Sequence, residues 1–264
     1  MIEKGDGMKE GLQMFDLSGQ WALVTGSSRG LGYAIARGLA RVGASVVIHG
    51  SRRETVEKAA SALTAEGLTT AVTAFDVRNV DQVTAAIEAL RSEGIAPDII
   101  VNNAGINLRH PLAEFPYEDW KAVLETHLDG SYAVAKAAIG PMIENRKGKI
   151  INICSLASEV ARPRISAYAT AKGGLKMLTK AMAVEWAPHG ICANGIAPGY
   201  FLTEMNTELK ANKEFDDWVC KSTPAGRWAN PDELVGAAVF LSSPASDYVN
   251  GHMLAVDGGF LASM

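Results

Sequence analysis

Short apolar runs alternate with longer amphipathic stretches along most of the chain. The short runs are rich in valine and isoleucine, which is typical of strands that are buried on both faces. The predicted strands cover residues 20–26, 44–50, 70–77, 97–105, 148–155, 191–199 and 252–259. The longer stretches repeat apolar residues at helical spacing and predict helices at 31–43, 53–66, 80–93, 117–144, 166–187 and 231–242.

This alternation of strands and helices predicts a parallel sheet that is covered by helices on both faces. No linker, repeat or low-complexity tract interrupts it, so we expect residues 15–264 to form a single domain. The fold class is therefore α/β, a doubly wound sheet of the Rossmann type with about seven strands. Residues 1–14 are charged and broken by glycine, and we expect them to form a flexible tail.

Composition and charge narrow the classes of function. The net charge of −4 gives no overall attraction to nucleic acid or to an anionic membrane. The chain has neither the apolar N-terminal run of a secretory signal nor an uninterrupted membrane span. Cys154, Cys192 and Cys220 form no CxxC pair and are odd in number, which favours reduced thiols in the cytoplasm. The histidines show no metal-binding spacing, so no metal site is predicted.

A glycine-rich turn, TGSSRGLG, follows the first predicted strand. Gly26, Gly30 and Gly32 allow the backbone to turn tightly and to approach a pyrophosphate closely, while Ser28 and Arg29 lie within the same turn. The helix that follows directs its free N–H groups toward the anion. We therefore predict dinucleotide binding here, although the spacing differs from GxGxxG and an ordinary turn is the alternative.

The end of the second strand selects the cofactor. An acidic residue there would accept a hydrogen bond from the ribose 2′-hydroxyl of NAD. This chain has Gly50 instead, followed by Ser51, Arg52 and Arg53, and Arg29 stands in the glycine turn. Guanidinium groups suit a 2′-phosphate, so NADP is the predicted cofactor and NAD is less favoured. A solvated helix start is the alternative interpretation of these arginines.

Tyr168 and Lys172 lie four residues apart in SAYATAKGG and hence on one face of a helix. A free tyrosine has a pKa of about 10, and a nearby ammonium group favours the phenolate. A bound oxidised nicotinamide would act in the same direction. Tyr168 is therefore expected to take a proton from an alcohol or to donate one to a carbonyl oxygen. Ser155 ends the preceding strand, where its hydroxyl can hold the reacting oxygen.

Taken together, these motifs resemble the short-chain dehydrogenase/reductase family. TGSSRGLG, NNAG at 102–105, Ser155, YATAK and APG at 197–199 have the order and spacing of that family across nearly the whole chain. The resemblance implies that Tyr168 is the general acid/base. It also implies that Lys172 lowers the pKa of Tyr168 and binds the nicotinamide ribose, and that Ser155 orients the substrate.

The same resemblance implies further cofactor contacts. Asn102 would support the central strand, Asp76 would neighbour the adenine, and Thr203 would contact the carboxamide. The other positions that the resemblance assigns to the cofactor site are Val77, Asn103, Pro198 and Gly199. It also implies a homotetramer.

One position departs from the family. The family usually has an asparagine in a segment like V-N-L-x-G, where this chain reads THLDG with His127. That asparagine holds a water of the proton relay largely through its main-chain carbonyl, which His127 retains. Either the imidazole perturbs the relay and titrates near neutral pH, or His127 is a packed residue with no part in the chemistry.

Within the family, the segments 161–187, 198–209, 222–228 and 240–262 resemble the bacterial gluconate 5-dehydrogenases. This likeness implies hydride transfer between NADP and C5 of gluconate, which interconverts D-gluconate and 5-dehydro-D-gluconate. Related substrates remain open, namely 2-deoxygluconate, a keto-deoxygluconate or a 3-oxoacyl thioester. A protein of a different class, which senses NADP without turnover, is the remaining alternative.

A sugar acid needs a cation for its carboxylate. Arg109 follows the fourth predicted strand and is expected to face the substrate, because a forked guanidinium suits a carboxylate. A surface arginine is the alternative, and Arg162 in the loop after Ser155 is a second candidate. The aromatic segment 200–222 is expected either to form a lid over the substrate or to pack at a subunit contact.

Overall fold

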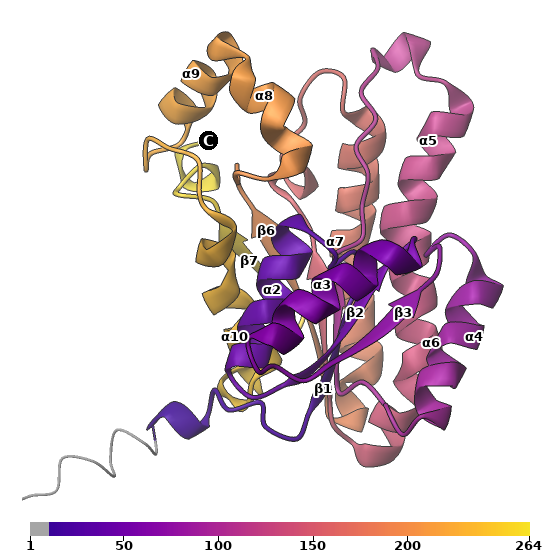
Figure 1. Ribbon diagram of the computed structural model, residues 1–264. Coiled ribbons are helices and arrows are strands. Elements are labelled where there is room, and N and C mark those ends of the chain that lie inside the picture. The colour runs from indigo at the N-terminus through magenta and orange to yellow at the C-terminus, as the bar shows by residue number, and fades with distance from the viewer. Residues whose placement is uncertain (1–10) are drawn as a thin grey trace, which may run out of the picture.

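Seven parallel strands form the sheet at the centre of the computed structural model, which describes residues 11–264 (Figure 1). Their order is β3-β2-β1-β4-β5-β6-β7. The strands are β1 (Trp21–Val24), β2 (Ser45–Gly50), β3 (Thr70–Ala74), β4 (Ile99–Asn102), β5 (Gly148–Ile153), β6 (Ile191–Pro198) and β7 (Met253–Val256). The prediction of a doubly wound parallel sheet is confirmed. Residues 1–10, most of the predicted tail, lie outside the described residues.

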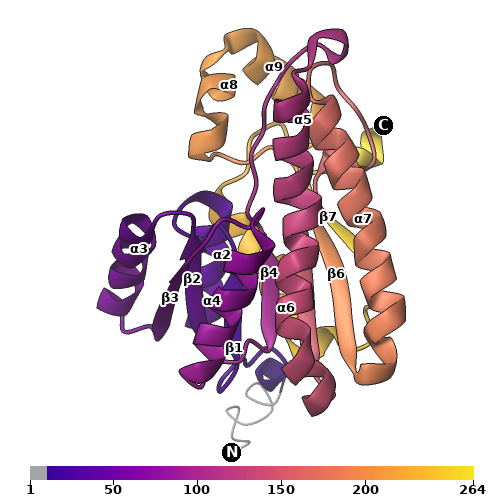
Figure 2. The same ribbon diagram turned by 90° about the vertical axis from the view of Figure 1, so that its right-hand side faces the viewer.

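Helices cover both faces of this sheet. One face carries α2 (Gly30–Arg41), α3 (Arg53–Ala65) and α10 (Val235–Ser242). The other carries α4 (Val80–Ser92), α6 (Gly130–Asn145) and α7 (Ser166–Trp186), and Figure 2 shows α6 and α7 side by side in front of the strands. The remaining helices are α5 (Tyr117–Leu124), α8 (Thr207–Ala211) and α9 (Lys213–Ser222).

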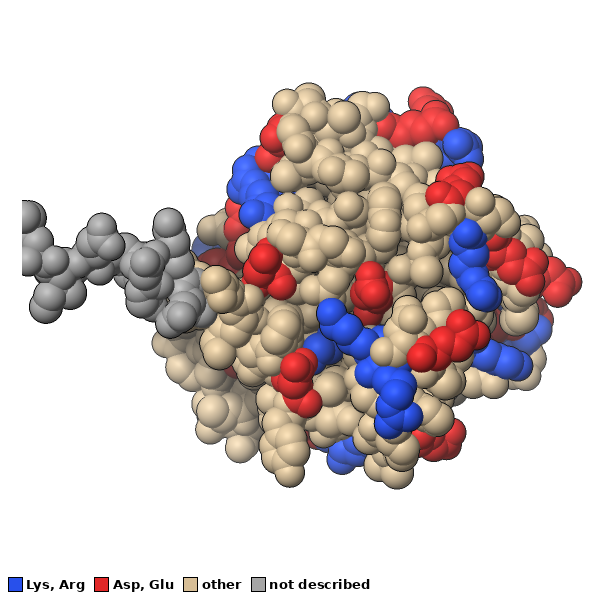
Figure 3. Space-filling view, turned by 90° about the horizontal axis from the view of Figure 1, so that it is seen from below, with Lys and Arg blue, Asp and Glu red and all other residues tan. Residues whose placement is uncertain are grey.

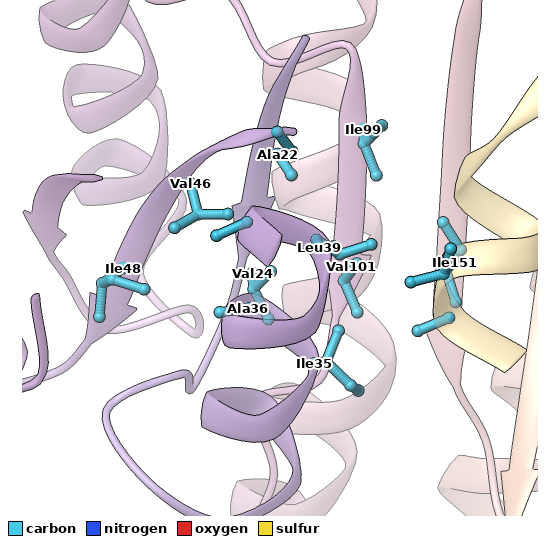
Figure 4. Packing of buried hydrophobic residues seen from close by; sticks show 14 of the residues in the cluster. Ala22, Val24, Ile35, Ala36, Leu39, Val46, Ile48, Ile99, Val101 and Ile151 are labelled. Carbon is cyan, nitrogen blue, oxygen red and sulfur yellow. The ribbon is translucent and has the colours of Figure 1, made fainter. Parts of the chain in front are cut away.

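The core lies in two layers because successive side chains of a strand point to opposite faces. Val24 and Val101 pack under α2, whereas Leu23 and Ile100 pack against α4 and α6. Figure 4 shows the first layer, in which strand side chains meet Ile35 and Leu39 of α2. The strands β1, β2, β4, β5 and β6 are buried on both faces, so they read as continuous apolar runs in the sequence rather than as alternating ones.

The helix predicted at 117–144 contains a change of pitch. After α5 the chain makes one π-helical turn, η2 (Glu125–Asp129), and then continues as α6. The N–H of Gly130 donates to the carbonyl of Glu125, five residues earlier. A π-turn inserts one residue into a helix and is frequent at functional sites. His127 lies in this turn, which packs against α7.

The surface is mixed in charge on the face that Figure 3 shows, where lysine and arginine side chains are interspersed with acidic ones. None of the helices in residues 11–264 combines the length and hydrophobicity that crossing a bilayer requires. Within the same residues, no group of three or more histidine, cysteine or acidic side chains comes together as a metal site would require. The three cysteines are free thiols.

Candidate active site

A cleft of about 900 Å³ lies at the carboxyl ends of the strands. The chain passes from β1 outward to β3 and then returns to place β4 beside β1. Ligands of open α/β sheets bind at such a reversal, because the loops that follow the two central strands diverge there. The predicted site residues line this cleft with three exceptions. Arg52 and Arg53 are exposed at the start of α3, and Asn102 is buried at the end of β4, where it donates to Asn152.

The glycine turn forms one wall of the cleft and requires its glycines. A Cβ at Gly32 would lie 2.4 Å from the Asn103 side-chain nitrogen and 2.5 Å from the Gly26 carbonyl oxygen. Asn103 donates from that nitrogen to the carbonyls of Thr25 and Gly26. Arg29, the N-cap of α2, forms no side-chain cap, so the first N–H groups of the helix are free at the cleft. This wall fits the diphosphate of a dinucleotide.

His49 braces the glycine turn, a role that sequence reasoning missed. Its Nδ1 accepts a hydrogen bond from the N–H of Gly26 at 3.0 Å, so Nε2 carries the proton and donates to the Phe75 carbonyl at 3.1 Å. The imidazole also contacts the Phe75 ring at a tilt of 41°, with centroids 4.0 Å apart. Burial lowers the pKa of His49 to about 4 and keeps it neutral. The only signal was a polar residue within the apolar run 44–50.

The arginines near the cofactor wall are arranged differently from the sequence-based expectation. Arg29 reaches across the cleft and pairs with Glu204 at 3.0 Å, where both side chains are largely exposed. Arg78, which was not predicted, holds Asp76 through both carboxylate oxygens and lowers the pKa of that carboxyl group. Ser51 lines the cleft, but Arg52 does not.

Ser155, Tyr168 and Lys172 converge in the middle of the cleft. Ser155 caps η3 (Leu156–Ser158) directly after β5, and its Oγ accepts the N–H of Ala157 at 3.1 Å. On α7, the Lys172 ammonium lies 5.6 Å from the centre of the Tyr168 ring and donates to the Ile153 carbonyl. Lys172 is only 3% exposed, and burial lowers its pKa to about 8.

The pKa of Tyr168 moves in the direction opposite to the prediction. Burial raises it, and this outweighs the hydrogen bond with Ser155 and the Arg109 charge, both of which lower it. Lys172 directs its ammonium at the Ile153 carbonyl, so it is not among the main influences on the phenol. The surrounding residues of the protein therefore keep the Tyr168 hydroxyl protonated at neutral pH.

His127 is neutral and packed. Its Nε2 donates to the Ile106 carbonyl at 2.7 Å, and its ring meets the Tyr168 ring edge-on, with centroids 5.1 Å apart. Burial and then the Lys172 charge hold the pKa of His127 well below its usual value, so the reading in which it titrates near neutral pH is wrong. Its main-chain carbonyl accepts the Ser131 hydroxyl at 2.7 Å.

Arg109 and Arg162 occupy the part of the cleft away from the glycine turn. Arg109 is half-buried, its Nε is buried without a hydrogen-bond partner, and burial lowers its pKa. It is therefore not a plain surface arginine. The Arg162 guanidinium lies over the rings of Tyr200, Phe215 and Trp218, at 5.7, 5.0 and 5.5 Å from their centres.

The side-chain charges that are left unpaired at the cleft are all positive. Arg29 and Asp76 are neutralised by Glu204 and Arg78 respectively. Among the described residues, no carboxylate lies within ion-pair distance of the other lining cations, which are Arg109, Arg162 and Lys172. Neutral polar atoms are also left over in this part of the cleft, because Asn107 Oδ1 and His127 Nδ1 are buried without partners. The arrangement suits an anionic ligand that carries several polar groups.

Segment 200–222 stands over the carboxyl ends of the strands, where Figure 1 shows α8 and α9 above the sheet. It includes the short helix η5 (Glu204–Asn206) and contributes to the lining of the cleft. Its lining residues are Tyr200, Phe201, Thr203, Glu204, Met205, Asn206, Leu209 and Trp218. The position is that of a lid, as one of the two interpretations of the sequence expected.

Comparison with known proteins matches residues 26–261 to a family described as "Enoyl-(Acyl carrier protein) reductase". The chain is 50% identical to gluconate 5-dehydrogenase of Gluconobacter oxydans, over 95% of this chain and 98% of the relative. It is 45% identical to 2-dehydro-3-deoxy-D-gluconate 5-dehydrogenase of Formosa agariphila, over 96% and 97% of the two chains. A crystal structure of a gluconate 5-dehydrogenase from Burkholderia cenocepacia, in complex with NADP and tartrate, is similar with a TM-score of 0.94. That enzyme shares 50% identity over 96% of this chain and 100% of its own.

Proposed function

The chain belongs to the short-chain dehydrogenase/reductase family, and on that premise we propose that it is an NADP-dependent oxidoreductase that interconverts D-gluconate and 5-dehydro-D-gluconate. One observation carries the proposal. A single cleft joins a diphosphate-binding glycine turn and the Ser155, Tyr168 and Lys172 group to a region with two unpaired arginines. Relatives at about half identity act on gluconate or bind NADP, which supports the same assignment.

When bound, NADP supplies or accepts the hydride. The free N–H groups at the start of α2 would hold its diphosphate, with His49 keeping the turn in place. Arg29 and Arg78 line the cleft beside Ser51 and are the cations available to a 2′-phosphate. Arg29 would exchange its exposed pairing with Glu204 for that contact at little cost, because exposed ion pairs contribute about 0–1 kcal/mol.

In reduction, Tyr168, which its raised pKa keeps protonated at neutral pH, donates its proton to the carbonyl oxygen of the substrate. Ser155 holds the same oxygen through its hydroxyl. In oxidation, Tyr168 first loses its own proton to solvent, and the resulting phenolate accepts the proton of the substrate hydroxyl. Lys172, with a pKa of about 8, is mostly protonated at neutral pH, and by resemblance to the family it would bind the nicotinamide ribose.

The substrate class follows from what the cleft leaves unpaired. A sugar acid brings a carboxylate for the arginines and hydroxyl groups for the buried polar atoms of Asn107 and Arg109. An apolar acyl chain would leave those atoms without partners, which is costly. A protein that only senses NADP would need no phenol, hydroxyl and ammonium gathered in the same cleft.

The test is a matched assay of D-gluconate with NADP and NAD, and of 5-dehydro-D-gluconate with NADPH and NADH. Tyr168→Phe removes the transferable proton with little change of shape, and we expect turnover to fall by about 100-fold or more. Tyr132→Phe, at an exposed tyrosine of α6 outside the cleft, is the control. Turnover of another carbonyl compound in place of these sugar acids would refute the proposed substrate. Full activity of Tyr168→Phe would refute the role of Tyr168 as general acid/base.

A second candidate substrate is 2-dehydro-3-deoxy-D-gluconate, which the similarity to the Formosa agariphila enzyme favours. The chemistry would again act at C5, so kcat/KM values for the two sugar acids measured side by side decide between them. By resemblance to the family we also propose a homotetramer in the cytoplasm. Sedimentation of the purified protein and fractionation of the source cells test these two points.

A further inference from the structure

Arg162 has an unusual setting within the cleft. It comes from the loop between η3 and α7, which belongs to the body of the domain. Two of the three rings under its guanidinium, Phe215 and Trp218, belong to α9 in the segment over the cleft, and Tyr200 follows β6. A cation over aromatic faces is attracted by them, yet the edge of its plane stays free. Arg162 lines the cleft and has no carboxylate partner among residues 11–264.

Arg162 and the reacting phenol belong to different side-chain groups of the cleft. Arg162 lies over the rings of Tyr200, Phe215 and Trp218. Tyr168 instead contacts the His127 ring and lies beside the Lys172 ammonium. Burial raises the pKa of Tyr168 and of Tyr200, and the Arg109 charge offsets part of the rise in each. The Arg162 charge acts on Tyr200 and on Arg109 but is not a main influence on Tyr168. Arg162 therefore lies in the aromatic group around Tyr200, whereas Arg109 acts electrostatically on both Tyr168 and Tyr200.

Starting from the proposed function, we propose that Arg162 binds the carboxylate of the sugar acid and so determines specificity for acids over neutral polyols. In gluconate the carboxylate and C5 lie toward opposite ends of the carbon chain. A cation removed from Tyr168 is therefore better placed for the carboxylate than Arg109 is. Arg109, whose Nε is buried without a partner, is left for the hydroxyl-bearing part of the chain.

The aromatic contact explains why an arginine suits this position. Stacking holds the guanidinium plane, so its N–H groups are directed at a carboxylate with less loss of side-chain entropy. Two parallel N–H···O bonds to a carboxylate are strong and geometrically selective. Because α9 supplies part of this support, the carboxylate site is complete only when the segment 200–222 lies over the cleft.

The experiment compares D-gluconate with D-glucitol, which carries an alcohol in place of the carboxylate. In Arg162→Gln we expect kcat/KM for gluconate to fall about 10- to 100-fold through KM, as the loss of hydrogen bonds to a charged group predicts. The kcat for gluconate and the kcat/KM for glucitol should stay within about threefold. Arg164→Gln removes the same charge from an exposed position in the same loop, outside the cleft, and should change neither.

A binding measurement separates this inference from the proposed function. Gluconate is titrated by calorimetry into protein saturated with NADPH, where both ligands are reduced and no turnover occurs. Binding that is lost in Arg162→Gln but kept in Arg164→Gln supports the inference, even if wild-type protein never oxidises gluconate. Absence of gluconate binding in the wild type, unchanged binding in Arg162→Gln, or equal losses for gluconate and glucitol would each overturn it.

Arg162→Lys covers the case in which the glutamine variant fails to fold. This variant keeps a cation over the rings but loses the fork of N–H groups. We expect gluconate to bind at least about threefold more weakly, with glucitol unaffected. An affinity for gluconate equal to that of the wild type would contradict the bidentate carboxylate contact.

Discussion

Replacing Lys172 with methionine tests how strongly the fold desolvates the cation at the centre of the cleft. Lys172 is 3% exposed, and burial lowers its pKa from 10.5 to about 8. At neutral pH the folded protein therefore holds a charge that the unfolded chain solvates better. The difference in pKa means that the charged Lys172 side chain lowers the unfolding free energy by about 3 kcal/mol at neutral pH.

The sign of the pH dependence follows from the same two pKa values. Between pH 8 and 10.5 the unfolded chain still binds the proton that folded Lys172 has released, so stability rises with pH across this window. Lys172→Met lacks the effect. At pH 7 the unfolding free energy of Lys172→Met exceeds that of the wild type by less than about 3 kcal/mol. The reason is that the Ile153 carbonyl loses its hydrogen-bond donor in the variant, at a cost of about 1–3 kcal/mol.

Urea unfolding, followed by tryptophan fluorescence at a fixed protein concentration from pH 7 to 10, measures the effect. We expect the wild type to gain about 2–3 kcal/mol relative to Lys172→Met between pH 8 and pH 10. Lys180→Met, at an exposed lysine of the same helix, is the control and should show no such trend. If the difference between wild type and Lys172→Met stays flat over this range, the cation is solvated and the reasoning fails.

Three further predictions concern the walls of the cleft. Gly32→Ala places a Cβ 2.4 Å from the Asn103 side chain, so we expect NADPH, titrated by its fluorescence, to bind about 10- to 100-fold more weakly. Binding at wild-type affinity would mean that the turn can widen. His127→Asn should lower kcat less than about tenfold and leave the pH profile unchanged, since His127 stays neutral; a proton-transfer role would cost about 100-fold or more. Because the pKa of His49 is about 4 against 6.5 in the unfolded chain, the stability advantage of wild type over His49→Gln should shrink by about 2 kcal/mol from pH 6.5 to pH 5. A constant advantage in urea unfolding would contradict the buried, neutral imidazole.

Much of the fold could be predicted because helices and strands follow from the spacing of apolar residues within short segments. Apolar runs and helical spacing located all seven strands and the helices that pack on the sheet, with ends displaced by a few residues, but not the short helices α8 and α9. The glycine turn and the spacing of Tyr168 and Lys172 also identified the main parts of the site, since each is a property of a short segment. The π-turn at Glu125–Asp129 was missed because one inserted residue leaves the apolar pattern almost unchanged.

The electrostatic state of the site belongs to the tertiary structure. Whether Tyr168 has a raised or lowered pKa depends on burial and on where the Lys172 ammonium points, and neither follows from their spacing along one helix. The same holds for His127, which the sequence left open between a titrating and a packed role and which burial beside Lys172 keeps neutral.

The contact partners of the arginines could not be predicted from neighbouring residues either. Arg29 meets Glu204, which is 175 residues away along the chain, and Arg162 meets rings from α9. The sequence alone thus determined which elements form, in what order, and which reactive groups they carry, because neighbouring residues decide those properties. Only the folded sheet decided which of these groups are desolvated and which charges remain unpaired, because both depend on contacts between segments far apart in the chain.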